Sequence, residues 1–178
     1  AYPNAVGGDW RPTGTNNDLE FTPLLLHDIE GRYSVQAAKV YAIGFSEGAG
    51  MSQRVGCDLA TLFAGIGSVA HSIHQDVADT CNPALPISVV TFHGSADNYY
   101  NGGTSRTGVP VYSAQETAAF YAGKDNCPLP SQSEQFPDIL TDGTSVMDTK
   151  EWWSNCAGGS TVTFYTIGNG AHAWPGDP

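Results

Sequence analysis

The segment Tyr41–Gln53, "YAIGFSEGAGMSQ", is the main indication of the fold in this sequence. It contains a G-x-S-x-G motif with Ser46 at its centre. The apolar run 39–45 before the motif predicts a buried strand, and residues 47–63 after it predict a helix. A serine at such a strand-to-helix turn is exposed and can act as a nucleophile. The alternative is an ordinary serine in a glycine-rich loop.

The residues beside Ser46 fit the first interpretation. Gly44 and Gly48 would allow a strained turn, because a side chain at either position is expected to clash with the neighbouring strand or helix. The N–H of Glu47 and the helix N-terminus could stabilise an oxyanion. The Glu47 carboxylate itself either influences substrate charge preference or faces solvent.

Strand and helix signals alternate along the rest of the chain. A helix is expected from Asp18 to Gly31, and Ser113 is expected to cap a second helix over 113–126. The region 128–150 is rich in Pro, Ser and Asp and predicts a long surface loop or hairpin. Further strands are expected at 65–70, 86–94 and 161–170. This alternation favours an α/β fold with a mostly parallel sheet and flanking helices, formed by residues 1–178 as a single domain.

Two residues that could complete a catalytic triad with Ser46 follow predicted strands. Asp97 comes just after the strand 86–94, and His172 comes just after the strand 161–170. The order Ser, Asp, His is the order found in α/β hydrolases, and the ends of parallel strands meet at one edge of a sheet. The alternatives are a turn-forming aspartate and a structural surface histidine.

The other histidines have weaker claims to function. His71 and His74 have the i, i+3 spacing of a metal pair, but no third ligand with convincing spacing follows, so a solvated loop is favoured over a metal site. His93 is expected to pack at its strand end near Asp97. His27 lies in a predicted helix and has no assigned role.

Aromatic residues near the proposed triad could form a binding surface for a sugar or phenolic ring. Trp174 and the pair Tyr99 and Tyr100 are the candidates, because they neighbour His172 and Asp97 in the sequence. Core packing is favoured for Trp152 and Trp153.

The four cysteines predict two disulfides. None lies in a C-x-x-C pair, and an even count without metal spacing is typical of an oxidising compartment. Four cysteines allow three pairings, and the sequential pairing is favoured because it closes two loops of medium length. It joins Cys57 to Cys81 and Cys127 to Cys156. The alternative is four buried thiols.

Composition excludes several classes of partner. The chain has 178 residues, of which 40% are hydrophobic and 14% are charged, against roughly 25% charged in typical soluble domains. Its net charge of −11 argues against nucleic acid and anionic lipid as partners. No apolar run has the roughly 18 residues that a membrane span requires.

Three segments together carry a family resemblance. "KVYAIGFSEGAGMSQR", "FHGSAD" and "GAHAWPG", in this order, resemble the secreted esterases that include polyhydroxybutyrate depolymerases, feruloyl esterases and acetylxylan esterases. The resemblance extends from about Tyr2 to Pro178. It implies an α/β-hydrolase fold, an extracellular location and a reaction without cofactor or metal.

The resemblance also implies residue roles. It makes Ser46 the nucleophile, Asp97 the acid and His172 the base. Cys127 and Cys156 match the family's cysteine pattern as well. In this family Gly and Thr usually stand where this chain has Ala171 and Ala173. Members also have several strands before the position of Ala1, with an oxyanion loop, so the chain is expected to lack these N-terminal strands and to represent a partial domain.

The expected activity is hydrolysis of carboxylic esters by a monomeric enzyme. The first expected substrates are feruloyl or acetyl esters of plant cell-wall polysaccharide, and polyhydroxyalkanoate polyesters are the second. A serine peptidase and a non-catalytic carbohydrate-binding or structural domain with the same fold remain alternatives.

Overall fold

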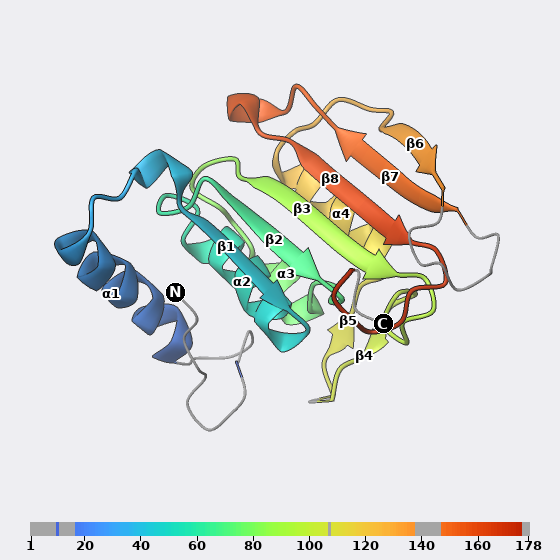
Figure 1. The fold of residues 1–178 in the computed structure, drawn as a ribbon, viewed down its shortest axis with the longest axis horizontal. Helices are drawn as coiled ribbons and strands as arrows, with labels where there is room; N and C mark the ends of the chain where they lie inside the picture. The colour runs from blue at the N-terminus through green and yellow to red at the C-terminus, as the bar shows by residue number, and fades with distance from the viewer. Residues whose placement is uncertain (1–9, 11–16, 107, 138–146, 176–178) are drawn as a thin grey trace.

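The computed structural model describes residue 10 and residues 17–106, 108–137 and 147–175. Their centre is a six-stranded sheet, shown in Figure 1. Its strands are β1 (Tyr41–Phe45), β2 (Gly65–Val69), β3 (Ser88–Gly94), β6 (Gln132–Phe136), β7 (Asp148–Trp153) and β8 (Val162–Ile167). They lie in the order β1-β2-β3-β8-β7-β6; the first four are parallel, and β7 and β6 are antiparallel to their neighbours. The predicted mostly parallel sheet is confirmed.

Helices flank this sheet. They are α1 (Asn17–Arg32), α2 (Glu47–Asp58), α3 (Gln75–Thr80) and α4 (Ala114–Lys124), with the short 3-10 turns η2 (Ala37–Lys39) and η3 (Ala157–Gly159). Figure 1 shows α2, α3 and α4 on one face of the sheet and α1 beyond the β1 edge. A short hairpin of β4 (Gly103–Thr104) and β5 (Pro110–Val111) lies near the carboxyl ends of the parallel strands. Within the described residues, no helix has the length and apolar character needed to cross a membrane.

Helix α4 begins where the sequence predicts. The Ser113 Oγ accepts a hydrogen bond from the Glu116 N–H at 3.1 Å, and the Glu116 carboxylate accepts one from the Ser113 N–H at 2.8 Å. This reciprocal capping box satisfies two N–H groups that a helix start leaves without partners. It therefore fixes Ser113 as the start of α4.

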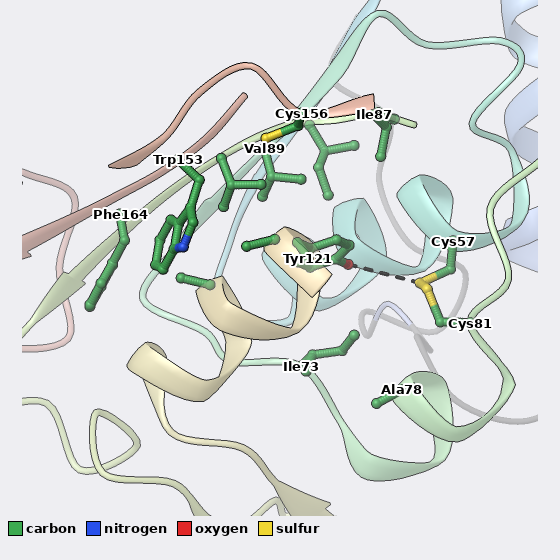
Figure 2. Close-up of a cluster of buried hydrophobic side chains, with 14 of the residues drawn as sticks. Cys57, Ile73, Ala78, Cys81, Ile87, Val89, Tyr121, Trp153, Cys156 and Phe164 are labelled. Carbon is green, nitrogen blue, oxygen red and sulfur yellow. Dashed lines mark hydrogen bonds between the residues drawn. A yellow bond between two sulfur atoms is a disulfide. The ribbon is translucent and has the colours of Figure 1, made fainter. Parts of the chain in front are cut away.

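The core lies between the sheet and these helices. Figure 2 shows Val89 of β3 and Phe164 of β8 beside Trp153 of β7, with Tyr121 of α4 opposite them. Tyr121 is fully buried, and its hydroxyl donates to the Gln53 carbonyl of α2 at 3.1 Å. This bond ties α4 to the helix that follows Ser46. Trp153 packs in the core as predicted.

Trp152 differs from the expectation of core packing. It is half-buried, and the Lys150 ammonium lies 4.6 Å from its ring centroid. Successive strand residues face opposite sides of a sheet, so Trp152 faces away from the side on which Trp153 packs. Only one of two adjacent strand residues can reach the same core.

Both predicted disulfides are confirmed. Cys57 is bonded to Cys81, and Cys127 is bonded to Cys156. The first joins the last turn of α2 to the end of α3, and the second joins the end of α4 to the start of η3. By closing loops of 24 and 29 residues, each stabilises the fold by roughly 2–4 kcal/mol.

Two predicted elements differ in extent. Helix α2 ends at Asp58, although the sequence predicts helix up to residue 63. Strands β6 and β7 occupy parts of the region 128–150 that predicts a loop or hairpin, and they pair as a hairpin. Strand β7, "DTKEWW", has no apolar alternation, so only its pairing with β8 reveals it.

Candidate active site

Ser46 occupies a sharp turn between β1 and α2. Its backbone has φ 52° and ψ −122°, which non-glycine residues rarely adopt. The Ser46 N–H donates to the Val69 carbonyl at 2.9 Å, and the Ser46 carbonyl accepts from Ala49 N–H at 2.9 Å. The turn is thus held by strand β2 on one side and helix α2 on the other. Such strain is characteristic of functional sites, since the surrounding structure must maintain it.

The two glycines of the motif have different roles. A Cβ on Gly44 would lie 2.0 Å from the Gly48 carbonyl oxygen, so only glycine fits at this position. A Cβ on Gly48 would meet only Cδ1 of Trp10, at an ordinary 3.9 Å. The expected clash at Gly48 is therefore wrong. Gly44 lies against the backbone carbonyl of Gly48. The Gly48 Cα itself has room for a side chain.

The structure brings Ser46, Asp97 and His172 into one hydrogen-bonded chain. His172 Nε2 lies 2.9 Å from Ser46 Oγ, and His172 Nδ1 lies 2.7 Å from Asp97 Oδ2. Each residue follows the carboxyl end of a parallel strand: β1, β3 and β8 respectively. The His172 side chain is 39% exposed, so a ligand can reach the His172 end of this hydrogen-bonded series.

Asp97 is buried and held as an anion. Burial alone would raise its pKa, but the Tyr99 N–H, at 3.0 Å from Oδ1, and the nearby imidazoles of His172 and His93 outweigh it and lower the pKa. An ionised carboxylate accepts the Nδ1–H of His172, which leaves Nε2 free to accept a proton from a serine hydroxyl.

Backbone bonds between two loops set the distance from Asp97 to His172. Ser95 N–H donates to the Ile167 carbonyl at 2.9 Å, and Ala96 N–H donates to the Gly170 carbonyl at 3.0 Å. A Cβ on Gly94 would lie 2.1 Å from the Gly170 carbonyl oxygen, so the loops touch at a glycine. The distance between Asp97 and His172 therefore depends on the pairing of β3 with β8.

The residue after Ser46 begins helix α2. Glu47 is the first helical residue, so its N–H has no acceptor within the helix and lies next to Ser46. Its carboxylate forms an ion pair with Arg106 of the β4–β5 hairpin, and the hairpin thus reaches the edge of the site. The sequence does not reveal this pair, because charged residues so far apart have no pattern that links them.

Aromatic contacts surround His172. Phe45, which directly precedes Ser46, lies 5.0 Å from the His172 ring and 5.7 Å from the Trp174 ring, with which it stacks. Trp174 is 43% exposed, so it lies beside the triad and open to solvent. Phe45 is a residue of the candidate site that the sequence pattern did not single out, although its position directly before Ser46 could have indicated it.

The two candidate tyrosines lie differently. Tyr99 is half-buried and contacts Asp97 through its backbone N–H. Tyr100 points into the protein: it packs on the core, and its hydroxyl lies 3.2 Å from Thr166 Oγ1. It is therefore a poor candidate for contact with a ligand.

His71 and His74 are not in a solvated loop, and that prediction is wrong. His74 is buried, and the two rings lie 5.0 Å apart just after β2. Burial lowers the pKa of His71 to about 3, and burial also lowers the pKa of His74. Both imidazoles are therefore neutral at pH 7. No group of three or more His, Cys, Asp or Glu among the described residues could hold a metal ion.

Similarity to known proteins extends over most of the chain. It is 32% identical over 165 residues to feruloyl esterase B of Piromyces equi, covering 88% of this chain. It is also 30% identical over 180 residues to NocK of Nocardia uniformis subsp. tsuyamanensis, provisionally named an esterase, covering 94% of this chain. The chain spans only 29% and 51% of these two curated relatives. No protein-family model matches.

The fold is similar to a solved structure. Acetyl xylan esterase from Aspergillus awamori superposes with a TM-score of 0.63 at 17% identity, covering 96% of this chain and 70% of that one. At this identity the similarity concerns the fold. The mostly parallel sheet with its flanking helices is thus consistent with an α/β-hydrolase-like fold.

Proposed function

We propose that the protein is a serine hydrolase that cleaves carboxylic esters through Ser46, His172 and Asp97. The observation that carries this proposal is the continuous chain of contacts from Ser46 Oγ through both ring nitrogens of His172 to a buried carboxylate. Similarity to proteins named as esterases supports the reaction class.

The geometry suggests a definite role for each group. Ser46 Oγ attacks the ester carbonyl as His172 Nε2 removes its proton. Asp97 holds the imidazole in the tautomer with hydrogen on Nδ1 and stabilises the imidazolium that forms. The imidazolium then gives its proton to the leaving alcohol, and a water molecule activated by His172 hydrolyses the acyl-enzyme. No cofactor takes part in these steps.

The oxyanion requires N–H donors close to Ser46. The Glu47 N–H is the proposed donor within this chain, because it lies at the start of α2, where the helix dipole is positive. Removing one donor of this kind typically lowers the rate by ~10²–10³-fold. The Glu47–Arg106 ion pair keeps the carboxylate from adding an unbalanced negative charge beside the developing oxyanion.

For the substrate we propose feruloyl or acetyl esters carried on plant cell-wall polysaccharide. The names of the relatives support this class, and Trp174 offers an exposed ring beside His172 on which a sugar or phenolic ring could stack. Tyr99 is proposed as a second contact. Polyhydroxyalkanoate polyesters remain a prediction from the sequence, which the names of these relatives do not support.

The two disulfides are compatible with an oxidising environment, and we propose an extracellular location. The protein's net negative charge is unfavourable for binding to nucleic acid or to anionic membranes. A monomer acting as one catalytic domain is also proposed.

The proposed reaction is tested by hydrolysis of matched esters and amides. Wild-type protein should hydrolyse p-nitrophenyl acetate and methyl ferulate, whereas Ser46→Ala should lose this activity and keep its circular dichroism spectrum. Ser133→Ala, an exposed serine on β6, is the matched control and should retain full activity. Faster hydrolysis of the matched amides than of the esters would favour a peptidase. Wild-type protein that hydrolyses neither would favour a non-catalytic binding domain.

A further inference from the structure

A second imidazole contacts the carboxylate of the proposed triad. His93 lies on β3, and its Nε2 is 3.2 Å from Asp97 Oδ2. This is the same oxygen that His172 Nδ1 approaches at 2.7 Å. The Tyr99 N–H contacts the other oxygen, Oδ1, at 3.0 Å. Three nitrogen atoms therefore surround the Asp97 carboxylate, one from β3, one from the loop after it and one from the loop after β8.

The surroundings of His93 leave its Nε2 few other partners. The residue is 2% exposed, and the Tyr100 ring meets it edge-on with the centroids 5.8 Å apart. Its Nε2 has no well-aligned hydrogen bond in the described residues, so the Asp97 contact is close but imperfectly oriented. Hydrogen bonds in a site without ligand are often long and tighten in the reacting complex.

The protonation of His93 follows from its burial. Burial lowers the pKa of His93, although Asp97 opposes this effect. A neutral imidazole has one N–H, and an ionised carboxylate can only accept. The contact is therefore favourable only when the hydrogen is on Nε2.

We propose that His93 is a positioning residue, which donates its Nε2–H to Asp97 and so holds the carboxylate in the orientation that His172 requires. This inference rests on the proposed function, because His93 would act on the reaction only through Asp97 and His172. It does not touch Ser46. Its role is to restrict rotation of the carboxylate and to share its charge.

Loss of this donor should have two effects on Asp97. The carboxylate becomes free to rotate away from His172, and its pKa rises because burial is then opposed by fewer hydrogen bonds. The other titratable groups that face it are His172 and His71, both imidazoles. Neither replaces the lost donor, since His172 is already in contact and His71 acts only at longer range.

The test compares two amide side chains of different reach. In His93→Gln the amide nitrogen can occupy the place of Nε2, whereas in His93→Asn it is too short to do so. We expect His93→Gln to stay within about threefold of wild type. A lost hydrogen bond to a charged group predicts that His93→Asn loses about 10- to 100-fold in kcat with little change in KM. The pH at which the Asp97 carboxyl carbon titrates, followed by carbon-13 NMR, should move up in this variant by about half a pH unit, because burial is then opposed by fewer hydrogen bonds.

Equal kcat losses in both variants, with an unmoved titration of the Asp97 carboxyl carbon, would reduce His93 to a packing residue and overturn the proposal. So would wild-type kcat in His93→Asn. These readouts separate positioning from packing, since packing alone does not change the pH at which Asp97 is protonated.

A measurement on wild-type protein makes the test independent of ester hydrolysis and of variant folding. Nitrogen-15 NMR should show His93 as the neutral tautomer with hydrogen on Nε2. When acid protonates Asp97, as followed at its carboxyl carbon, the His93 Nε2 resonance should shift at the same pH. A tautomer with hydrogen on Nδ1 would overturn the proposal even if the esterase is active. The expected tautomer in an inactive protein would leave His93 as a partner of Asp97 and refute only the proposed function.

Discussion

Ser46 Oγ lies 2.9 Å from His172 Nε2, although 126 positions separate the two residues in the chain. Strands β1 and β8 are not neighbours, since β2 and β3 lie between them. The contact is therefore made by the loops that leave the parallel strands at one end, and not by strand pairing. A change that moves the β1 turn or the β8 loop should therefore break the contact between Ser46 and His172.

The turn itself provides a matched pair of substitutions. Gly44→Ala should destabilise the protein by about 3 kcal/mol or more and abolish hydrolysis, because its Cβ would lie 2.0 Å from the Gly48 carbonyl oxygen. Gly48→Ala should be tolerated and gain up to about 1 kcal/mol, since alanine favours the helix. Urea unfolding and ester hydrolysis measure both. Equal destabilisation by the two variants would contradict the described turn.

Asp97→Asn tests the orientation of His172. The asparagine amide cannot hold the imidazole with hydrogen on Nδ1 as a carboxylate does, so kcat should fall by about 10³–10⁴-fold. The control is Asp76→Asn in the first turn of α3, which should keep wild-type kcat. Steady-state kinetics on p-nitrophenyl acetate measures the effect, and a loss below tenfold in Asp97→Asn would argue against a triad.

Trp174→Ala tests the proposed binding surface. The ring stacks on Phe45 and is 43% exposed, so its removal should raise KM for methyl ferulate by about 5- to 20-fold. The effect on p-nitrophenyl acetate should be smaller, because its ring lies in the leaving group and its acyl group has no ring to stack. Trp152→Ala, on β7, is the matched control and should leave both KM values unchanged. Equal effects on both esters would point to displacement of His172 instead.

The lowered pKa of the half-buried His71 predicts acid sensitivity. The folded pKa of His71 is about 3, against 6.5 for the ordinary side chain. Between these pH values the unfolded chain binds a proton at His71 and the folded chain does not, so the free energy of unfolding decreases as the pH falls. His71 alone should account for about 2 kcal/mol at pH 5. Below about pH 3 both states bind the proton, and this dependence ends.

Urea unfolding at pH 7 and pH 5 measures the effect of His71. His71→Gln should reduce the loss of stability between these two pH values, whereas His27→Gln, an exposed residue on α1, should leave it unchanged. An unaltered loss in His71→Gln would show that the acid sensitivity arises elsewhere.

Much of the site could be predicted because each of its residues follows a recognisable strand. The apolar runs before Ser46, Asp97 and His172 identify β1, β3 and β8, and the carboxyl ends of parallel strands meet at one edge. The disulfides were predictable for a different reason, because an even number of cysteines without metal-binding spacing has few alternative roles. In these cases a local pattern contains the spatial information.

Other features have no local pattern. His71 and His74 lie in a polar-looking segment, and a β-bridge from His74 to Val111 packs this segment against β5. Strand β7 lacks apolar alternation and is formed by pairing with β8. The Glu47–Arg106 ion pair joins residues of different elements. These properties arise from tertiary contacts, which periodicity along the chain does not encode.

The most direct test of the central claim is covalent labelling of Ser46. A fluorophosphonate probe should react with the wild-type protein, and mass spectrometry of the digested product should locate the adduct on Ser46 alone. Ser46→Ala should not be labelled, and Asp97→Asn should be labelled far more slowly, because an activated serine requires its oriented base. An unlabelled wild type, or an adduct on another serine that persists in Ser46→Ala, would contradict the assignment of Ser46 as the nucleophile.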